Sequence, residues 1–146
     1  MMTSSARLKP VHGFAERKEQ DAARAFGESQ QKLQSESDKL EQLRHYRREY
    51  MERFHSVARQ GIQARRVLDY QAFIAKLDEA IGEQEKMLGY ARETSHRAKD
   101  QWMEKQSRSK ALGKVVERHQ VRERQEMDKR EQREQDERSQ HGRPLH

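Results

Sequence analysis

The stretch FHSVARQGIQARRVLDYQAFI, residues 54–74, contains the clearest break in a sequence that otherwise reads as helix. Gly61 is suited to the left-handed conformation that ends many helices. Asp69 is suited to cap a second helix, and Leu68 and Phe73 have the spacing of a hydrophobic staple around that cap. The stretch therefore predicts a helix stop, a short connection and a helix restart.

This break divides the chain into five predicted segments. We expect an N-terminal arm, a first helix, a turn, a second helix and a charged tail that is either helical or disordered, at residues 1–9, 10–60, 61–68, 69–120 and 121–146. A second helix that starts earlier, near Ala64, also fits the sequence. A connection this short forces consecutive helices to run antiparallel.

Two heptad stripes flank the break. The first alternates steps of four and three and holds Ala22, Phe26, Ser29, Leu33, Glu36, Leu40, Leu43, Arg47, Tyr50, Phe54 and Val57. The second holds Tyr70, Ile74, Leu77, Ile81, Gln84, Leu88, Ala91, Ser95, Ala98, Trp102, Lys105, Ser109, Leu112 and Val116. Such stripes are typical of coiled coils. They predict an all-α fold, with two long helices in an antiparallel coiled-coil hairpin and a charged C-terminal tail. Folding back around residue 63 or 64 would place Phe54 beside Ile74 and Leu40 beside Leu88.

Composition limits the size of any core. Of 146 residues, 32% are hydrophobic and 38% are charged, against about 45–50% and about 25% in globular domains. Cysteine is absent, which removes disulfides and thiolate chemistry and suits a reducing compartment. No apolar run approaches the roughly 20 residues of a membrane span, and the first residues lack the apolar region of a signal peptide. The sequence therefore predicts a cytoplasmic protein built from thin helices.

Residue patterns for catalysis or metal binding are missing. The seven histidines show neither HxxxH nor HExxH spacing. The glycines at 27, 82, 89 and 113 stand singly within helical patterns, so no phosphate-cradling loop is expected. A two-helix fold also offers no deep pocket for a catalytic group. We predict no enzyme activity, no cofactor and no metal.

The formal charge of +6 raises nucleic-acid binding as an alternative. Basic residues are interleaved with acidic ones along most of the chain, and the clearest local excess lies in residues 44–66, with seven Arg and two Glu. Mixed charge of this kind is typical of a solvated helix surface. A nucleic-acid-binding rod and a generic coiled-coil scaffold remain the alternative hypotheses, and we predict no nucleic-acid partner.

Three segments around the break carry a family resemblance. YRREYMERF at residues 46–54, ARQGIQ at 58–63 and VLDYQAFIAKLDEAIGEQ at 67–84 closely resemble the FliJ family of the bacterial flagellar type III export apparatus. The resemblance implies an antiparallel coiled coil whose terminal end enters the ring of the export ATPase (FliI) and whose tip meets the membrane export gate (FlhA). It further implies help with ATPase ring assembly, handling of export chaperones, and a cytoplasmic location peripheral to the inner membrane at the flagellar base.

Aromatic spacing near the break suggests where the tip would bind. In the predicted register, Tyr46, Phe73 and Ala80 share one flank of the hairpin with Met87, above Tyr50 and Leu77, with Arg47 and Arg48 at the rim. The rings either broaden the core or form an exposed patch of the kind that marks partner surfaces. With the gate named by resemblance alone, the predicted gate-binding set is Leu43, Tyr46, Tyr50, Phe73, Leu77 and Ala80.

The terminal end gives the second predicted site. Its apolar stripe thins towards Ala15, Leu112 and Val116, where two helices leave apolar groups poorly covered and a third partner could cover them. The resemblance makes this partner the ATPase ring. The two ends of the hairpin are thus predicted to differ in chemistry, as a coupling protein requires.

Overall fold

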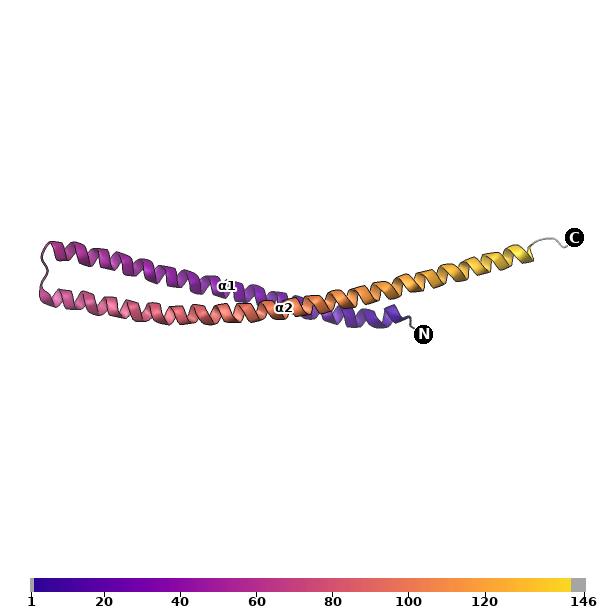
Figure 1. The fold of residues 1–146 in the computed structure, drawn as a ribbon, viewed down its shortest axis with the longest axis horizontal. Helices are drawn as coiled ribbons and strands as arrows, with labels where there is room; N and C mark the ends of the chain where they lie inside the picture. Colours follow the sequence, from indigo (N-terminus) through magenta and orange to yellow (C-terminus); the bar gives the residue numbers. More distant parts are fainter. Residues whose placement is uncertain (1, 143–146) are drawn as a thin grey trace. The chain divides into compact units, whose positions relative to one another are not determined.

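The computed structural model describes residues 2–142, and all the regular structure in that range is helical. Helix α1 spans Ser4–Arg59 and helix α2 spans Ala64–His141 (Figure 1). The two helices pack against each other and are joined by a tight connection. The predicted all-α helical hairpin is confirmed.

Gly61 ends α1 as predicted. Its φ of 88° lies in the left-handed region, which is strained for every residue with a side chain. Its N–H donates a 3.3 Å hydrogen bond to the carbonyl of Ala58, and the N–H of Gln60 donates one of 3.2 Å to Val57. These bonds satisfy carbonyls that the last turn of α1 would otherwise leave open.

Helix α2 begins at Ala64, so the predicted turn over residues 61–68 is too long and the alternative start near Ala64 is right. The carbonyl of Gln63 accepts hydrogen bonds of 3.0 and 3.2 Å from the first turn of the helix. Asp69 lies inside α2, and Leu68 is 65% exposed, so neither the predicted cap nor the staple forms. Among the described residues only Gly61 has a positive φ, and the Ala and Arg residues that follow Gln63 favour helix.

Helix α1 begins at Ser4, within the segment predicted to be an arm at residues 1–9. Thr3 caps it, because its Oγ1 accepts a 3.2 Å hydrogen bond from the N–H of Ala6. Pro10 lies inside the helix, where it removes one backbone donor. The helix continues through it because the residues on both sides still face α2, and Ser5 is buried there.

The charged tail is helical through His141, although nothing in the described part of the chain covers its end. Every residue from 124 to 142 is exposed. Gly142 closes the helix with a 2.9 Å hydrogen bond from its N–H to the carbonyl of Arg138. Residues 121–146 were predicted to be either helical or disordered, and the helical alternative is right as far as His141. Residues 143–146 lie outside the described range.

The structure divides into two compact units. The turn unit comprises residues 23–101, and the described part of the terminal unit comprises residues 2–22 and 102–142. Each is held together by a single narrow seam between α1 and α2. The buried residues of the turn unit are Ser29, Glu36, Leu40, Leu77, Leu88, Ala91 and Ser95, and those of the terminal unit are Ser5, Ala15, Ser109 and Val116. All lie on the predicted stripes or on their continuation, and nearly half are polar, so the core is thin.

The pairing of the two helices near the turn differs from the predicted register. The ring of Phe54 contacts that of Tyr70, with centroids 5.3 Å apart, whereas a fold-back around residue 63 or 64 pairs Phe54 with Ile74. The contact is four residues, about one helical turn, closer to the connection. The cause is the shorter turn, because a connection confined to residues 60–63 moves the centre of the fold-back towards the N-terminus.

Candidate partner-binding surfaces

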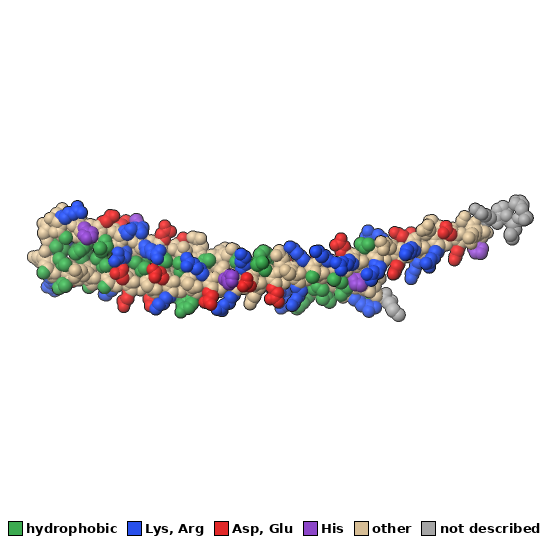
Figure 2. All heavy atoms as spheres, in the orientation of Figure 1, with side chains coloured by type: hydrophobic (Ala, Val, Ile, Leu, Met, Phe, Trp, Pro, Cys, Tyr) green, Lys and Arg blue, Asp and Glu red, His purple; other side chains and the backbone are tan. Residues whose placement is uncertain are grey.

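Five aromatic rings form a continuous cluster beside the turn. The aromatic cluster consists of Tyr46, Tyr50 and Phe54 from α1 and Tyr70 and Phe73 from α2. The centroids of Tyr50 and Phe73 are 4.4 Å apart, those of Tyr50 and Tyr70 are 5.1 Å apart, and those of Tyr46 and Phe73 are 6.1 Å apart. Figure 2 shows hydrophobic side chains gathered over this part of the hairpin between charged borders. Tilted and edge-to-face ring pairs at these distances are favourable.

The cluster divides into a floor and an outer ring. Tyr50, Phe54, Tyr70 and Phe73 are half-buried and fill the seam. Tyr46 remains 46% exposed while its edge packs against Phe73 in a T-shaped contact with an interplanar angle of 78°. The structure thus combines the two interpretations of the sequence, since four rings are mainly core and one is presented to solvent.

The other predicted gate-binding residues lie in the same unit. Leu43 and Ala80 are half-buried. Leu77 is only 7% exposed, so it can support the cluster from below but presents almost no surface itself. Met87, expected on the same flank, is 52% exposed.

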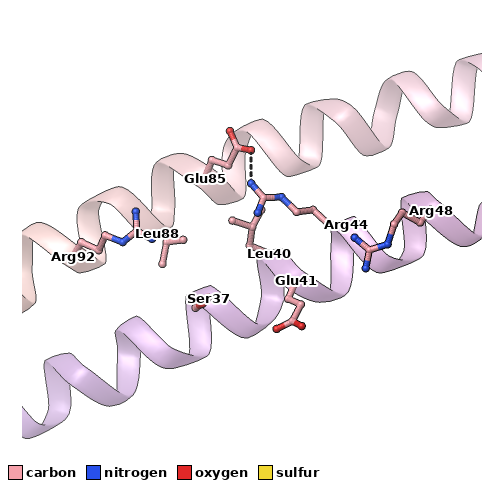
Figure 3. Close-up of a pocket in the computed structure, with 8 residues that line it drawn as sticks. All are labelled: Ser37, Leu40, Glu41, Arg44, Arg48, Glu85, Leu88 and Arg92. Carbon is pink, nitrogen blue, oxygen red and sulfur yellow. Dashed lines mark hydrogen bonds and ion pairs between the residues drawn. The ribbon is translucent and has the colours of Figure 1, made fainter.

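The predicted arginine rim forms only in part. Arg47 is held by an ion pair to Asp78 across the two helices, and this pair raises the pKa of Arg47 above its ordinary value through the hydrogen bond from its guanidinium. Arg48 instead lines a separate groove of about 440 Å³ with Leu40 and Leu88. Figure 3 shows this groove, with the guanidinium of Arg44 reaching Glu85 on α2 at 3.1 Å.

A polar layer interrupts the seam of the turn unit at Glu36, which is 3% exposed. The side-chain amide of Gln84 donates hydrogen bonds to the carboxylate and, at 3.0 Å, to the backbone carbonyl of Glu36. The ammonium groups of Lys32 and Lys39 lie 2.9 and 3.7 Å from the carboxylate. The hydrogen bond from Lys32, followed by that from Gln84, holds the pKa of Glu36 below its ordinary value.

Acidification should therefore destabilise the hairpin through Glu36. A lowered pKa in the folded state means that the carboxylate stabilises the fold above the pKa of glutamate in the unfolded chain, about 4.3. That stabilisation is lost as the pH falls through the lower folded-state value. We expect the thermal midpoint, followed by circular dichroism, to drop more between pH 6 and about pH 3 in the unmodified chain than in Glu36→Gln. Equal drops would show that Glu36 contributes nothing to the pH dependence.

The terminal unit places the predicted ATPase-binding residues mostly inside its seam. Ala15 and Val116 are 6% and 7% exposed, and Leu112 is half-buried. The apolar surface that they leave open comes from two residues that sequence reasoning missed, Val11 at 49% and Phe14 at 55% exposure. Both lie off the heptad stripe. The sequence feature that could have indicated them is the pair of apolar residues itself, because Val11 and Phe14 are three residues apart and therefore share one face of a helix beside the stripe.

Glu123 ties the start of α1 to α2 within the same unit. Its carboxylate accepts hydrogen bonds from the backbone N–H of Ser5 at 3.1 Å and from the Ser5 hydroxyl at 2.6 Å. These bonds lower the pKa of Glu123. A carboxylate at the positive end of a helix is favourable, so this contact secures the terminal unit where its apolar stripe has ended.

Residues 2–142 contain no grouping of three His, Asp or Glu side chains that could hold a metal ion. Over the same residues, neither helix has a segment apolar enough to cross a lipid bilayer.

Comparison with known proteins shows which family the chain resembles. Residues 4–142 match the model of the family described as flagellar FliJ protein. The chain is 31% identical over 117 residues to the flagellar FliJ protein of Escherichia coli K12, covering 80% of each chain. It is 29% identical over 117 residues to the flagellar FliJ protein of Salmonella typhi, again covering 80% of each chain.

Proposed function

Because the chain belongs to the flagellar FliJ family and is a component of the flagellar export apparatus, we propose that it couples the export ATPase (FliI) to the membrane export gate (FlhA). It also assists assembly of the ATPase ring and handling of export chaperones. The role is one of binding rather than catalysis, and the protein acts in the cytoplasm, held at the inner membrane by its protein partners.

The observation that carries this proposal is the exposed edge of the aromatic cluster. In a chain with 32% hydrophobic residues, a tyrosine that packs on a half-buried phenylalanine and keeps 46% of its surface open has the character of a binding anchor. Aromatic residues supported from below dominate many protein interfaces. We assign this surface to the gate, with Tyr46 as the anchor and Tyr50 and Phe73 as its support.

Two of the arginines near the aromatic cluster are engaged by carboxylates. Arg47 is paired with Asp78, and Arg44 is paired with Glu85. Binding to a phosphate backbone relies on cations that are free to replace counterions. Arginines already engaged by carboxylates offer less of that interaction, and they form instead a polar border around an apolar patch.

The terminal unit supplies the second contact of the proposed coupling protein. It carries apolar residues outside its seam, Val11 and Phe14, close to Ala15 and Leu112. These residues belong to the terminal unit, whereas the aromatic cluster belongs to the turn unit. We assign it to the ATPase ring, with Val116 as buried support.

Removing the outer parts of the terminal unit should abolish the contact with the ATPase. Deletion of residues 1–14 together with 120–146 removes Val11 and Phe14 as well as both partners of the contact between Ser5 and Glu123. We expect loss of ATPase stimulation and ring assembly in a turnover assay with purified FliI. Circular dichroism should still report a helical hairpin, because the seam of the turn unit is untouched. Unaltered stimulation would contradict the assignment of this unit.

A further inference from the structure

A basic groove opens beside the seam of the terminal unit. The terminal groove has a volume of about 280 Å³ and is lined by Val11, Phe14, Ala15, Lys18, Lys105, Arg108 and Leu112. Four of these residues are apolar and three are basic. Small-molecule sites occupy about 300–1,000 Å³, so the groove is slightly smaller than such a site. It is large enough to take one or two large side chains of a protein partner.

The lining of the terminal groove is basic. Three of its lining residues are cations, and none is acidic. The Lys18 ammonium lies 5.2 Å from the centroid of the Phe14 ring, so it is attracted to the ring face. Arg108 approaches Glu104 only at 3.9 Å, with both side chains more than 60% exposed, which is a weak interaction in water.

Lys105 is the least expected of the three cations. It occupies a seam position of the second stripe and is half-buried, where an apolar side chain would pack better. Within residues 2–142 it forms no ion pair with a carboxylate. Long cationic side chains bury their stems along apolar surface and keep the ammonium in water, so the Lys105 ammonium is accessible to a carboxylate of a protein that covers the groove. The position of Lys105 therefore indicates an anionic group on whatever covers the groove.

We propose that the terminal groove docks an amphipathic acidic segment of the partner, with a large apolar side chain against Val11, Phe14 and Leu112 and carboxylates facing Lys18, Lys105 and Arg108. The inference rests on the proposed function, because Ala15 and Leu112 belong to the surface assigned to the ATPase ring. It adds the chemistry of the contact, which combines an apolar anchor with negative charge. Such a segment would cover the exposed apolar surface and place negative charge beside the cations.

The test measures binding of the full-length chain to full-length FliI at low and high salt. Lys105→Glu combined with Arg108→Glu reverses the basic border, and we expect at least a tenfold loss of affinity and a weaker dependence of affinity on salt. The matched control is Lys76→Glu combined with Lys86→Glu. It changes the net charge equally at exposed residues of the turn unit, at least 19 residues from Lys105 along α2. Its affinity should stay within about twofold at physiological salt, because surface charges beyond a Debye length are screened. Circular dichroism verifies that both variants are helical.

Two further variants separate the outcomes. Phe14→Ser should also weaken binding at least tenfold, because it removes the exposed apolar wall. If Phe14→Ser and the deletion of residues 1–14 with 120–146 abolish binding while the charge reversal acts no more strongly than its control, the partner surface is apolar rather than acidic and the inference is overturned. If the deletion leaves binding intact, the proposed function of the terminal unit fails instead. Tighter binding of the charge-reversed variant would show a basic partner surface and would also overturn the inference.

Discussion

Replacing Tyr46 and Phe73 by alanine is expected to reduce the affinity for the cytoplasmic portion of FlhA by about 100-fold or more and to abolish motility. Each ring is a candidate anchor, and truncating an anchor of this kind costs about 2 kcal/mol or more, roughly 30-fold in affinity. The two costs are not expected to add fully, because the rings contact each other at 6.1 Å. Calorimetric titration of the gate portion into the full-length chain measures the loss.

Tyr90→Ala is the matched control for this variant. Tyr90 lies in the same unit and is 64% exposed, and it belongs to none of the ring pairs of the aromatic cluster. Its replacement should leave gate affinity unchanged. The single variant Tyr46→Ala keeps the test decisive if the double variant loses helicity, because Tyr46 is the exposed member of the pair. Full gate affinity in a folded Tyr46→Ala chain would mean that the rings serve the core alone.

The largest effect on stability should come from the leucine layer of the turn unit. Leu40 and Leu88 are 4% and 6% exposed, and replacing a buried leucine by alanine typically costs about 2–5 kcal/mol. A core this thin has little reserve, since even ordinary domains are stable by only about 5–15 kcal/mol. We expect Leu40→Ala combined with Leu88→Ala to remove the cooperative thermal transition of the turn unit, followed by circular dichroism at 222 nm.

Leu68→Ala is the matched control for the leucine layer. Leu68 is 65% exposed in α2, so the same chemical change should alter stability by less than about 0.5 kcal/mol. A cooperative transition that survives in the double variant at an unchanged midpoint would show that the seam through Leu40 and Leu88 does not hold the hairpin together.

The core could be predicted from the sequence because a helix buries residues by periodicity alone. Leu40, Leu77 and Leu88 fall on the heptad stripes, and the structure buries all three. Gly61 could also be predicted, because its left-handed backbone is specific to glycine. The contact between Tyr46 and Phe73 could be predicted as well, because their heptad positions place both residues on one flank of the hairpin.

The features that spacing could not supply depend on packing between the helices. The start of α2 was placed five residues late, because Asp69 has the chemistry of a cap but lies in a segment that is already helical. Helix α1 begins at Ser4 rather than at residue 10, because contacts with α2 extend the helix through Pro10. The register near the turn depended in turn on the length of the connection. Val11 and Phe14 were missed because they lie off the stripe, where periodicity assigns residues to solvent.

In the proposed function, one chain binds the ATPase and the gate at the same time through different units. Immobilised FliI should capture the cytoplasmic portion of FlhA only when the full-length chain is present. The variant with Tyr46→Ala and Phe73→Ala should remain on FliI but no longer bring the gate portion with it, whereas the variant with Lys105→Glu and Arg108→Glu should be captured poorly itself. Displacement of the chain from FliI by added gate portion would mean that both partners use one surface, and it would contradict the account.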